Sequence, residues 1–242
     1  TLAMGLLPTY AQIGIWAPIL LLLLRIVQGA AIGGEVPGAW VFVSEHVPAK
    51  HVGFACGTLT AGLTAGILLG SLTATLINSL FTPQEVLDWA WRLPFLLGGV
   101  FGLCAVYLRR MLQETPVFAE MQQRHALAAE LPLKTVLREH RGAIVLSMLL
   151  TWVLSAAIVV VILMTPTLLQ TLYGFDAATA LKANSLAIVF LSLGCVAAGA
   201  IVDRVGAGRV LLLGGLLLGV TSWTFYSSLK LHPEWLFPLY AL

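Results

Sequence analysis

Two charged residues, Arg25 and Glu35, stand inside one long apolar run, and their side chains offer the most distinctive chemistry in this sequence. If that run crosses a membrane, a charge at its centre costs about 2.5–3.5 kcal/mol on insertion scales, so each charge needs a partner, a ligand or water. A guanidinium group can bind a carboxylate through two parallel hydrogen bonds, and a buried carboxylate can take up a proton. Arg25 and Glu35 are therefore the first candidates for a functional site.

Arg25 shares one face of a helix with Gln28, Gly29 and Gly33, because spacings of three, four and eight residues return to the same face. That face presents a charge, an amide and a groove for a neighbouring backbone. Glu35 lies about 15 Å further along the axis and about 80° around it, which is too far for a direct ion pair with Arg25. Each charge then needs another partner or a water-filled cavity. For both residues, structural pairing is the alternative to a place on a ligand pathway.

The elements that hold these residues are long apolar segments. The 242 residues are 59% hydrophobic and only 10% charged, with a mean hydropathy of +0.95, whereas a soluble domain is about 25% charged. This composition excludes a secreted, cytosolic or nucleic-acid-binding protein and makes the lipid bilayer the main partner. The runs are continuous rather than alternating, which predicts an all-α, polytopic membrane protein and not a barrel. The expected complete spans are 16–43, 53–80, 93–108, 142–165, 183–202 and 210–229, with partial spans at 1–8 and 236–242.

Basic residues divide the connecting segments into two sets. Nine of the 13 Lys and Arg lie in segments 44–52, 109–141 and 203–209. Three more are spread over the other connections, and the last is Arg25. The positive-inside rule places the first set in the cytoplasm. Five aromatic residues fit this orientation, since they lie near the outer ends of spans: Trp16, Trp89, Trp91, Tyr173 and Trp235.

The longest connection, 109–141, divides the six complete spans into three and three. Thr115-Pro116 is typical of a helix start, with proline at the first helical position. Leu133, Val136 and Leu137 form an apolar stripe among basic residues, which predicts a short helix on the cytoplasmic surface. We therefore expect a polar linker between two membrane bundles.

No group of residues favours an enzyme or a metal site. Cys56, Cys104 and Cys195 lie in apolar runs without metal-ligand spacing, and all five histidines lie in connecting segments. The sequence contains no HExxH, GxSxG or GxxxxGK[ST] motif. We therefore expect no enzymatic activity and no cofactor.

The run from Arg25 to Glu35 reads R-x-x-Q-G-x-x-x-G-G-E and resembles the fourth helix of the major facilitator superfamily, specifically of its metabolite–proton symporter group. Val36-Pro37-Gly38 departs from the Trp-Gly-Gly that usually follows in this group, and Val52 stands where a basic residue is expected. Four other segments agree with the superfamily in order and spacing: Ser44-Glu45-His-Val-Pro48, Trp91-Arg92-Leu-Pro94-Phe95, Glu114-Thr115-Pro116-Val117-Phe118, and the loop Gly199-x-x-x-Asp203-Arg204-x-Gly206-x-Gly208-Arg209.

The resemblance implies a partial bundle that runs from the end of helix three to the start of helix ten in a twelve-helix fold. Residues 1–108 would form part of the N-terminal bundle (helices three to six), and 142–242 part of the C-terminal bundle (helices seven to ten). Residues 109–141 would be the cytoplasmic linker. The chain is therefore expected to be a piece of a longer, multi-pass protein of the bacterial inner membrane.

By the same resemblance, the parent protein is expected to be a secondary transporter driven by the proton gradient. It would carry a small organic acid or zwitterion together with protons. Span 53–80 lacks the Gly-Pro pair that the superfamily's antiporters place in this helix, which favours symport. Its Gly62, Gly66 and Gly70 predict close helix packing. The alternative is a truncated membrane fragment that transports nothing by itself.

In a transporter of this kind, Arg25 is expected to face a substrate carboxylate, with Gln28 assisting. Glu35 is the candidate for proton coupling, because a buried carboxylate can take up a proton in the working pH range. Asn184, just inside the outer end of span 183–202, is a further candidate for the substrate pathway. Exposed capping is its alternative role.

The loop after span 183–202 has a physical logic of its own. An Asp at the inner end of a helix can accept hydrogen bonds from the N-terminus of a neighbouring helix, while arginines remain at the anionic interface. The resemblance makes this loop a gating latch, and a plain positive-inside turn is the alternative. The expected cytoplasmic gate comprises Glu45, Asp203, Arg204, Gly206 and Arg209.

The predicted orientation is testable by labelling. Cysteines introduced at residues 125 and 206 of the full-length protein should react with a membrane-impermeant reagent from the same side, because both lie in strongly basic connections. Labelling from opposite sides would refute the orientation.

Overall fold

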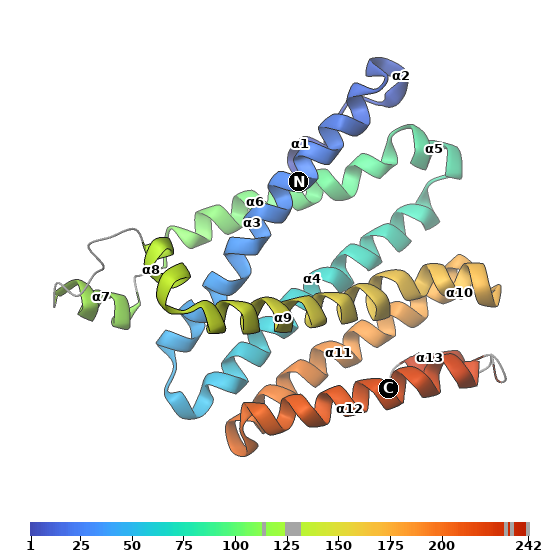
Figure 1. Ribbon diagram of the computed structural model, residues 1–242. Helices are drawn as coiled ribbons and strands as arrows, with labels where there is room; N and C mark the ends of the chain where they lie inside the picture. Colours follow the sequence, from blue (N-terminus) through green and yellow to red (C-terminus); the bar gives the residue numbers. More distant parts are fainter. Residues whose placement is uncertain (113–114, 124–131, 230–231, 233–234, 241–242) are drawn as a thin grey trace. The chain divides into compact units, whose positions relative to one another are not determined.

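The computed structural model describes residues 1–112, 115–123, 132–229, 232 and 235–240, with the backbone alone at 119 and 132–135 (Figure 1). All regular structure in these residues is helical. Six of the helical segments are long and apolar enough to cross a membrane. They confirm the expected spans: Trp16–His46, Ala49–Leu80, Ala90–Arg109, Arg141–Tyr173, Ala177–Val205 and Ala207–Leu229. The all-α, polytopic class is therefore confirmed.

The long helices of Figure 1 are α3 (Trp16–His46), α4 (Val52–Leu80), α6 (Leu93–Arg109), α9 (Arg141–Ile158), α10 (Thr165–Tyr173), α11 (Ala177–Val205) and α12 (Ala207–Leu229). The shorter ones are α1 (Leu2–Gly5), α2 (Tyr10–Ile13), α5 (Pro83–Asp88), α7 (Pro116–Gln123), α8 (Pro132–Glu139) and α13 (Leu236–Tyr240). Single 3₁₀ turns, Ala49–His51 and Ala90–Arg92, lead into α4 and α6.

The fourth span continues well past the predicted end at residue 165. A π-helical turn, Val159–Met164, joins α9 to α10 immediately before Pro166. Proline lacks an N–H and its ring crowds the carbonyl of the preceding turn, so a locally wider turn lets the helix pass it. The Thr165 hydroxyl donates to the Val160 carbonyl at 2.9 Å. The helix therefore continues to Tyr173 instead of ending at the proline.

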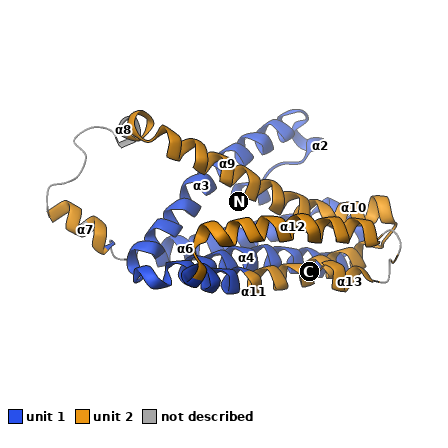
Figure 2. Cartoon of the chain, turned by 60° about the horizontal axis from the view of Figure 1, so that its bottom comes forward, with its two compact units in different colours: residues 1–115, 195–204 blue, residues 116–194, 205–242 orange. Residues whose placement is uncertain are grey.

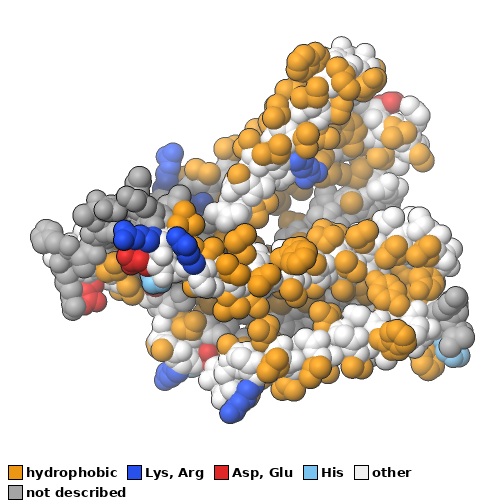
Figure 3. All heavy atoms as spheres, viewed as in Figure 1, with side chains coloured by type: hydrophobic (Ala, Val, Ile, Leu, Met, Phe, Trp, Pro, Cys, Tyr) orange, Lys and Arg blue, Asp and Glu red, His pale blue; other side chains and the backbone are white. Residues whose placement is uncertain are grey.

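Large apolar side chains remain exposed on all the long helices, and Figure 3 shows them over much of the visible surface. Leu22, Val27, Trp152, Leu212 and Trp223 are each more than 60% exposed. Apolar exposure on this scale is typical of helices that face lipid or further protein rather than water.

The described chain forms two compact units (Figure 2). Unit 1 comprises residues 1–115 and 195–204, and unit 2 comprises 116–194 and 205–242. In unit 1, α1 packs on α6, and α3 packs on α4. Arg92 ties α1 to the start of α6, because its Nη1 donates to the carbonyls of Gly5 and Leu7 at 2.8 Å each.

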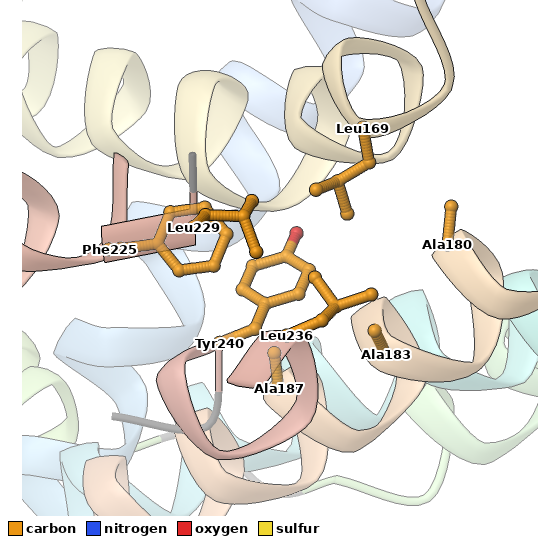
Figure 4. Close-up of a cluster of buried hydrophobic side chains, with 8 residues drawn as sticks. All are labelled: Leu169, Ala180, Ala183, Ala187, Phe225, Leu229, Leu236 and Tyr240. Carbon is orange, nitrogen blue, oxygen red and sulfur yellow. The ribbon is translucent and has the colours of Figure 1, made fainter. Parts of the chain in front are cut away.

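Unit 2 has a small core built around the Tyr240 ring (Figure 4). The Tyr240 hydroxyl lies 2.7 Å from both the Val161 carbonyl and the Asn184 side-chain oxygen. The core residues come from α10, α11, α12 and α13: Leu169, Ala180, Ala183, Ala187, Phe225, Leu229, Leu236 and Tyr240.

The segment predicted as a linker contains two short helices. α7 begins at Pro116, as the Thr115-Pro116 pair predicted, and α8 is the short helix expected near Leu133. The apolar stripe of α8 is only partly described, since the side chains of Leu133 and Lys134 lie outside the described part, as do Glu114 and His125. The role of 109–141 as a linker between two bundles stays a prediction.

In two connections on the predicted outer side, a carboxylate accepts hydrogen bonds at the start of a helix: Glu85 at α5 and Asp176 at α11. Glu85 accepts hydrogen bonds from the Thr82 backbone and hydroxyl at 2.8 Å each, which lowers the pKa of its carboxyl group. Asp176 precedes α11 and accepts from the Thr179 N–H at 2.9 Å, and its hydrogen bonds with Thr179 lower its pKa as well. The carboxylate of Glu85 therefore lies in the first turn of α5, and that of Asp176 directly before α11, where the positive end of each helix favours negative charge.

Candidate functional site

Arg25, Gln28 and Glu35 all lie on α3, which runs without interruption through Pro37. The Arg25 Nη1 donates to the Gln28 side-chain oxygen at 3.1 Å, so the two residues do share a face. The Gln28 amide nitrogen in turn donates to the Thr1 hydroxyl at 3.4 Å. Among the residues that the structure describes, Arg25 has no acidic partner. Its guanidinium group is exposed in this chain and keeps N–H donors for a ligand.

Glu35 forms an ion pair with Arg109, the last residue of α6. Both side chains are about half exposed, at 52% and 59%. Of the two expected alternatives for Glu35, another partner or a water-filled cavity, the structure shows another partner. The sequence does not reveal that partner, because Arg109 directly follows the predicted span and falls in the segment expected to be the linker. The available signal was a basic residue directly after a predicted span, 93–108, that itself carries no charge.

Asp203 joins the end of α11 to the start of α4 in unit 1. Its two carboxylate oxygens accept hydrogen bonds from the backbone N–H groups of Gly53, at 2.7 Å, and Phe54, at 2.8 Å. These donors belong to the first turn of α4, where N–H groups have no partner within the helix and the helix dipole favours negative charge. The hydrogen bonding expected of an Asp at this position is therefore confirmed, while the gating role stays a prediction.

The other gate candidates lie near the end of α3 or near the end of α11 along the chain. Glu45 is half-buried in the last turn of α3, and Arg204 is exposed next to Asp203. Gly206, between α11 and α12, has a φ of +94°, a conformation that a side chain would strain. Arg209 lies in the first turn of α12. None of these residues has a described hydrogen bond or ion pair with Asp203.

Three glycines allow α4 and the end of α11 to approach closely. A Cβ added at Gly53 would lie 2.6 Å from the Gly199 carbonyl oxygen, and one at Gly57 would lie 2.5 Å from the Cys195 carbonyl oxygen. A Cβ added at Gly199 would clash with the Gly53 backbone. Only glycine fits a backbone-to-backbone contact of this kind. The contact holds Asp203 within hydrogen-bonding distance of the α4 N-terminus.

The close packing predicted for Gly62, Gly66 and Gly70 is not found in the described part of the chain. A Cβ added at any of the three meets no atom within 4 Å. Sequence spacing identified the right helix and the right kind of contact, but the contact lies nearer the start of α4.

Asn184 is buried in unit 2, at 6% exposure, and its side-chain oxygen bonds the Tyr240 hydroxyl. Exposed capping, one of its two expected roles, is therefore wrong. Contact with a substrate stays a prediction, and in this structure the visible role of Asn184 is to hold α11 against α13.

These observations define a class of protein: a polytopic helical membrane protein that carries an arginine and an ion-paired glutamate on one apolar helix. The chain matches the Major Facilitator Superfamily over residues 1–242, and it belongs to that family. It is 31% identical over 234 residues to a Staphylococcus aureus protein named "Putative proline/betaine transporter", covering 97% of this chain and 50% of the relative.

Two further relatives match half of the chain. The glycine betaine/proline/ectoine/pipecolic acid transporter OusA of Dickeya dadantii is 44% identical over 120 residues, or 24% of its length. The proline/betaine transporter of Escherichia coli K12 is 40% identical over 120 residues, also 24% of its length. The chain spans about half the length of the staphylococcal relative. No solved structure matches it.

The glycine contact predicts different outcomes for two alanine substitutions on α4. Gly57→Ala should destabilise the full-length protein by about 1–3 kcal/mol, the usual cost of forcing an extra group into a packed contact. Gly62→Ala is the matched control, because its Cβ meets no described atom within 4 Å. Thermal unfolding in detergent checks this, with Gly57→Ala lower in Tm and Gly62→Ala at or above wild type. Equal Tm values for the two variants would contradict the contact.

Proposed function

We propose that the complete protein is a proton-coupled symporter that carries a small zwitterionic or carboxylate metabolite through the bacterial inner membrane. Membership of the Major Facilitator Superfamily and the names of its bacterial relatives support a transporter of this substrate class. The single observation that carries the proposal is Arg25. This arginine lies on an apolar helix without an acidic partner among the described residues, and an unpaired charge there is costly unless it serves a ligand.

Arg25 would bind the carboxylate of the substrate through its planar fork of N–H donors. Its hydrogen bond to Gln28 fixes one edge of the guanidinium group and leaves the other edge for the ligand. Proline and betaines, the substrates named for the relatives, each carry one carboxylate, so a single guanidinium group suits either of them.

Glu35 would carry the proton. Its carboxylate is the acidic group nearest Arg25 on α3, and its ion pair exists only while it is ionised. Protonation would therefore break a specific contact inside unit 1, which gives proton binding a structural consequence.

Asp203 would hold the cytoplasmic gate. Its hydrogen bonds to the first amides of α4 tie together two helix ends that the resemblance assigns to the cytoplasmic side. An anion at a helix N-terminus is worth about 0.3–2 kcal/mol, depending on its burial. An interaction of that size can bias two conformations without preventing their exchange.

The substrate role of Arg25 is tested by Arg25→Lys in the full-length protein, reconstituted into proteoliposomes. Uptake of labelled proline and glycine betaine is measured under an inward proton gradient. Lysine keeps the charge but loses the planar fork, so KM should rise at least about tenfold, as expected for the loss of one charge-assisted hydrogen bond. Arg110→Lys, on an exposed residue next to the end of α6, is the matched control. An unchanged KM in Arg25→Lys would return Arg25 to a structural role.

The gating role is tested by Asp203→Asn. Asparagine keeps one acceptor oxygen but loses the charge, so transport should fall severalfold while the protein stays folded in the membrane. Asp88→Asn is the control, since Asp88 is exposed and bonds only its helical neighbour Gln84 among the described residues. Wild-type uptake by Asp203→Asn would leave Asp203 as an ordinary helix cap.

A further inference from the structure

Because Glu35 and Arg109 form an ion pair, the two residues lie at the same depth, and the length of the span that ends at Arg109 indicates that depth. The span that ends at Arg109 begins at Ala90 and has 20 residues. At 1.5 Å per residue it is about 30 Å long, which matches the thickness of the hydrocarbon core. In the predicted orientation, with Trp89 and Trp91 near its outer end, a span of this length would place Arg109 at the inner boundary of that core. The ion pair brings the Glu35 carboxylate to the same level.

The length of α3 gives the same depth independently. Glu35 lies nineteen residues after Trp16, the aromatic residue at the outer end of α3. That separation is about 28 Å, so Glu35 again falls at the inner boundary. Arg25 lies about 15 Å nearer the outer side and is therefore close to the midplane. In this orientation the two charges of α3 would lie at different depths, Arg25 near the midplane and Glu35 near the cytoplasmic boundary.

Arg109 is the charge that faces Glu35 in the described part of unit 1. The helices packed on α3 are α1, α2 and α4, and none of them contains Asp, Glu, Lys, Arg or His. Their titratable groups are Tyr10 on α2 and Cys56 on α4, and α6 adds Cys104 and Tyr107 besides Arg109. On α3 itself, Arg25 and the terminal Glu45 and His46 each lie about 15 Å or more from Glu35 along the axis.

We propose that Arg109 is the positioning residue of the proton site, because it holds ionised Glu35 at the cytoplasmic boundary and so favours release of the proton to the cytoplasm. The proposal rests on the proposed function, in which Glu35 carries the proton. A proton from the outside adds to the Glu35 carboxylate, giving a neutral acid whose ion pair with Arg109 opens. The same proton then leaves to cytoplasmic water, and the carboxylate pairs with Arg109 again. Arg109 keeps its own proton throughout.

The test compares two transport modes in proteoliposomes that contain the full-length protein, with labelled glycine betaine as the probe. Accumulation under an inward proton gradient requires proton release, whereas counterflow exchange needs no net proton movement. Arg109→Gln should lower accumulation severalfold, because it removes the cation with which the Glu35 carboxylate pairs again after each proton is released. Counterflow should stay within about twofold of wild type, because the substrate site is elsewhere on α3.

Two further variants separate positioning from folding. Arg109→Lys keeps a cation beside Glu35 and should retain most of the accumulation. Arg110→Gln removes the same charge one residue further on and is the matched control, expected to behave as wild type. If Arg109→Gln alone does not fold, Glu35→Gln/Arg109→Gln removes both charges and leaves neither unpaired. This double variant should show the same counterflow as Glu35→Gln, since Arg109 acts only through Glu35.

The outcomes distinguish this inference from the proposed function. Wild-type protein that does not accumulate glycine betaine, or Glu35→Gln that still does, would contradict the proposed function, and the inference would fall with it. Normal accumulation by Arg109→Gln, beside a defective Glu35→Gln, would overturn the inference alone. A parallel loss of accumulation and counterflow in Arg109→Gln would also overturn the inference. So would lower counterflow in the double variant than in Glu35→Gln. Either result would make Arg109 part of the fold or of the substrate pathway.

Discussion

A charge placed among apolar helices must be matched, and this constraint explains the polar contacts of unit 1. Hydrocarbon cannot solvate a carboxylate or a guanidinium group, so each needs an opposite charge, a set of oriented dipoles or a ligand. Glu35 is matched by Arg109, and Asp203 by the free amides of α4. Among the described residues, the partner of the Arg25 guanidinium group is the neutral side-chain amide of Gln28. The incomplete match at Arg25 is what makes it the substrate candidate.

The hydrogen bonds of Asp203 to α4 depend on glycines, which have no side chain, at the contact between α4 and α11. Gly53 and Gly57 on α4 and Gly199 on α11 bring two backbones closer than any residue with a Cβ could. Within that contact the Asp203 carboxylate reaches two N–H groups that a helix N-terminus leaves without an internal partner. Packing and electrostatics therefore support each other at this point, since the glycines set the distance and the carboxylate adds the attraction.

The sequence predicts which segments form helices and what kind of partner a charged side chain needs. Hydropathy predicts the six spans. The position of Asp203 at the inner end of a helix predicts its hydrogen bonds to the N-terminus of a neighbouring helix. The sequence does not predict which residue of another helix makes a contact, or how the backbone passes a proline. Periodicity along α3 shows that Glu35 is not beside Arg25, but it cannot show that Arg109 approaches from α6. Likewise, the glycine spacing in α4 does not say which of its glycines meets a neighbour, and Pro166 does not reveal the π turn that carries the helix past it.

The central claim, that substrate and protons cross the membrane together, is tested most directly with a pH electrode. Proteoliposomes containing the full-length protein are suspended in weakly buffered medium without a proton gradient, and the membrane potential is clamped. Addition of glycine betaine should make the external medium more alkaline in step with betaine uptake, because each substrate carried inward takes protons with it. Betaine uptake with no change in external pH would contradict the account.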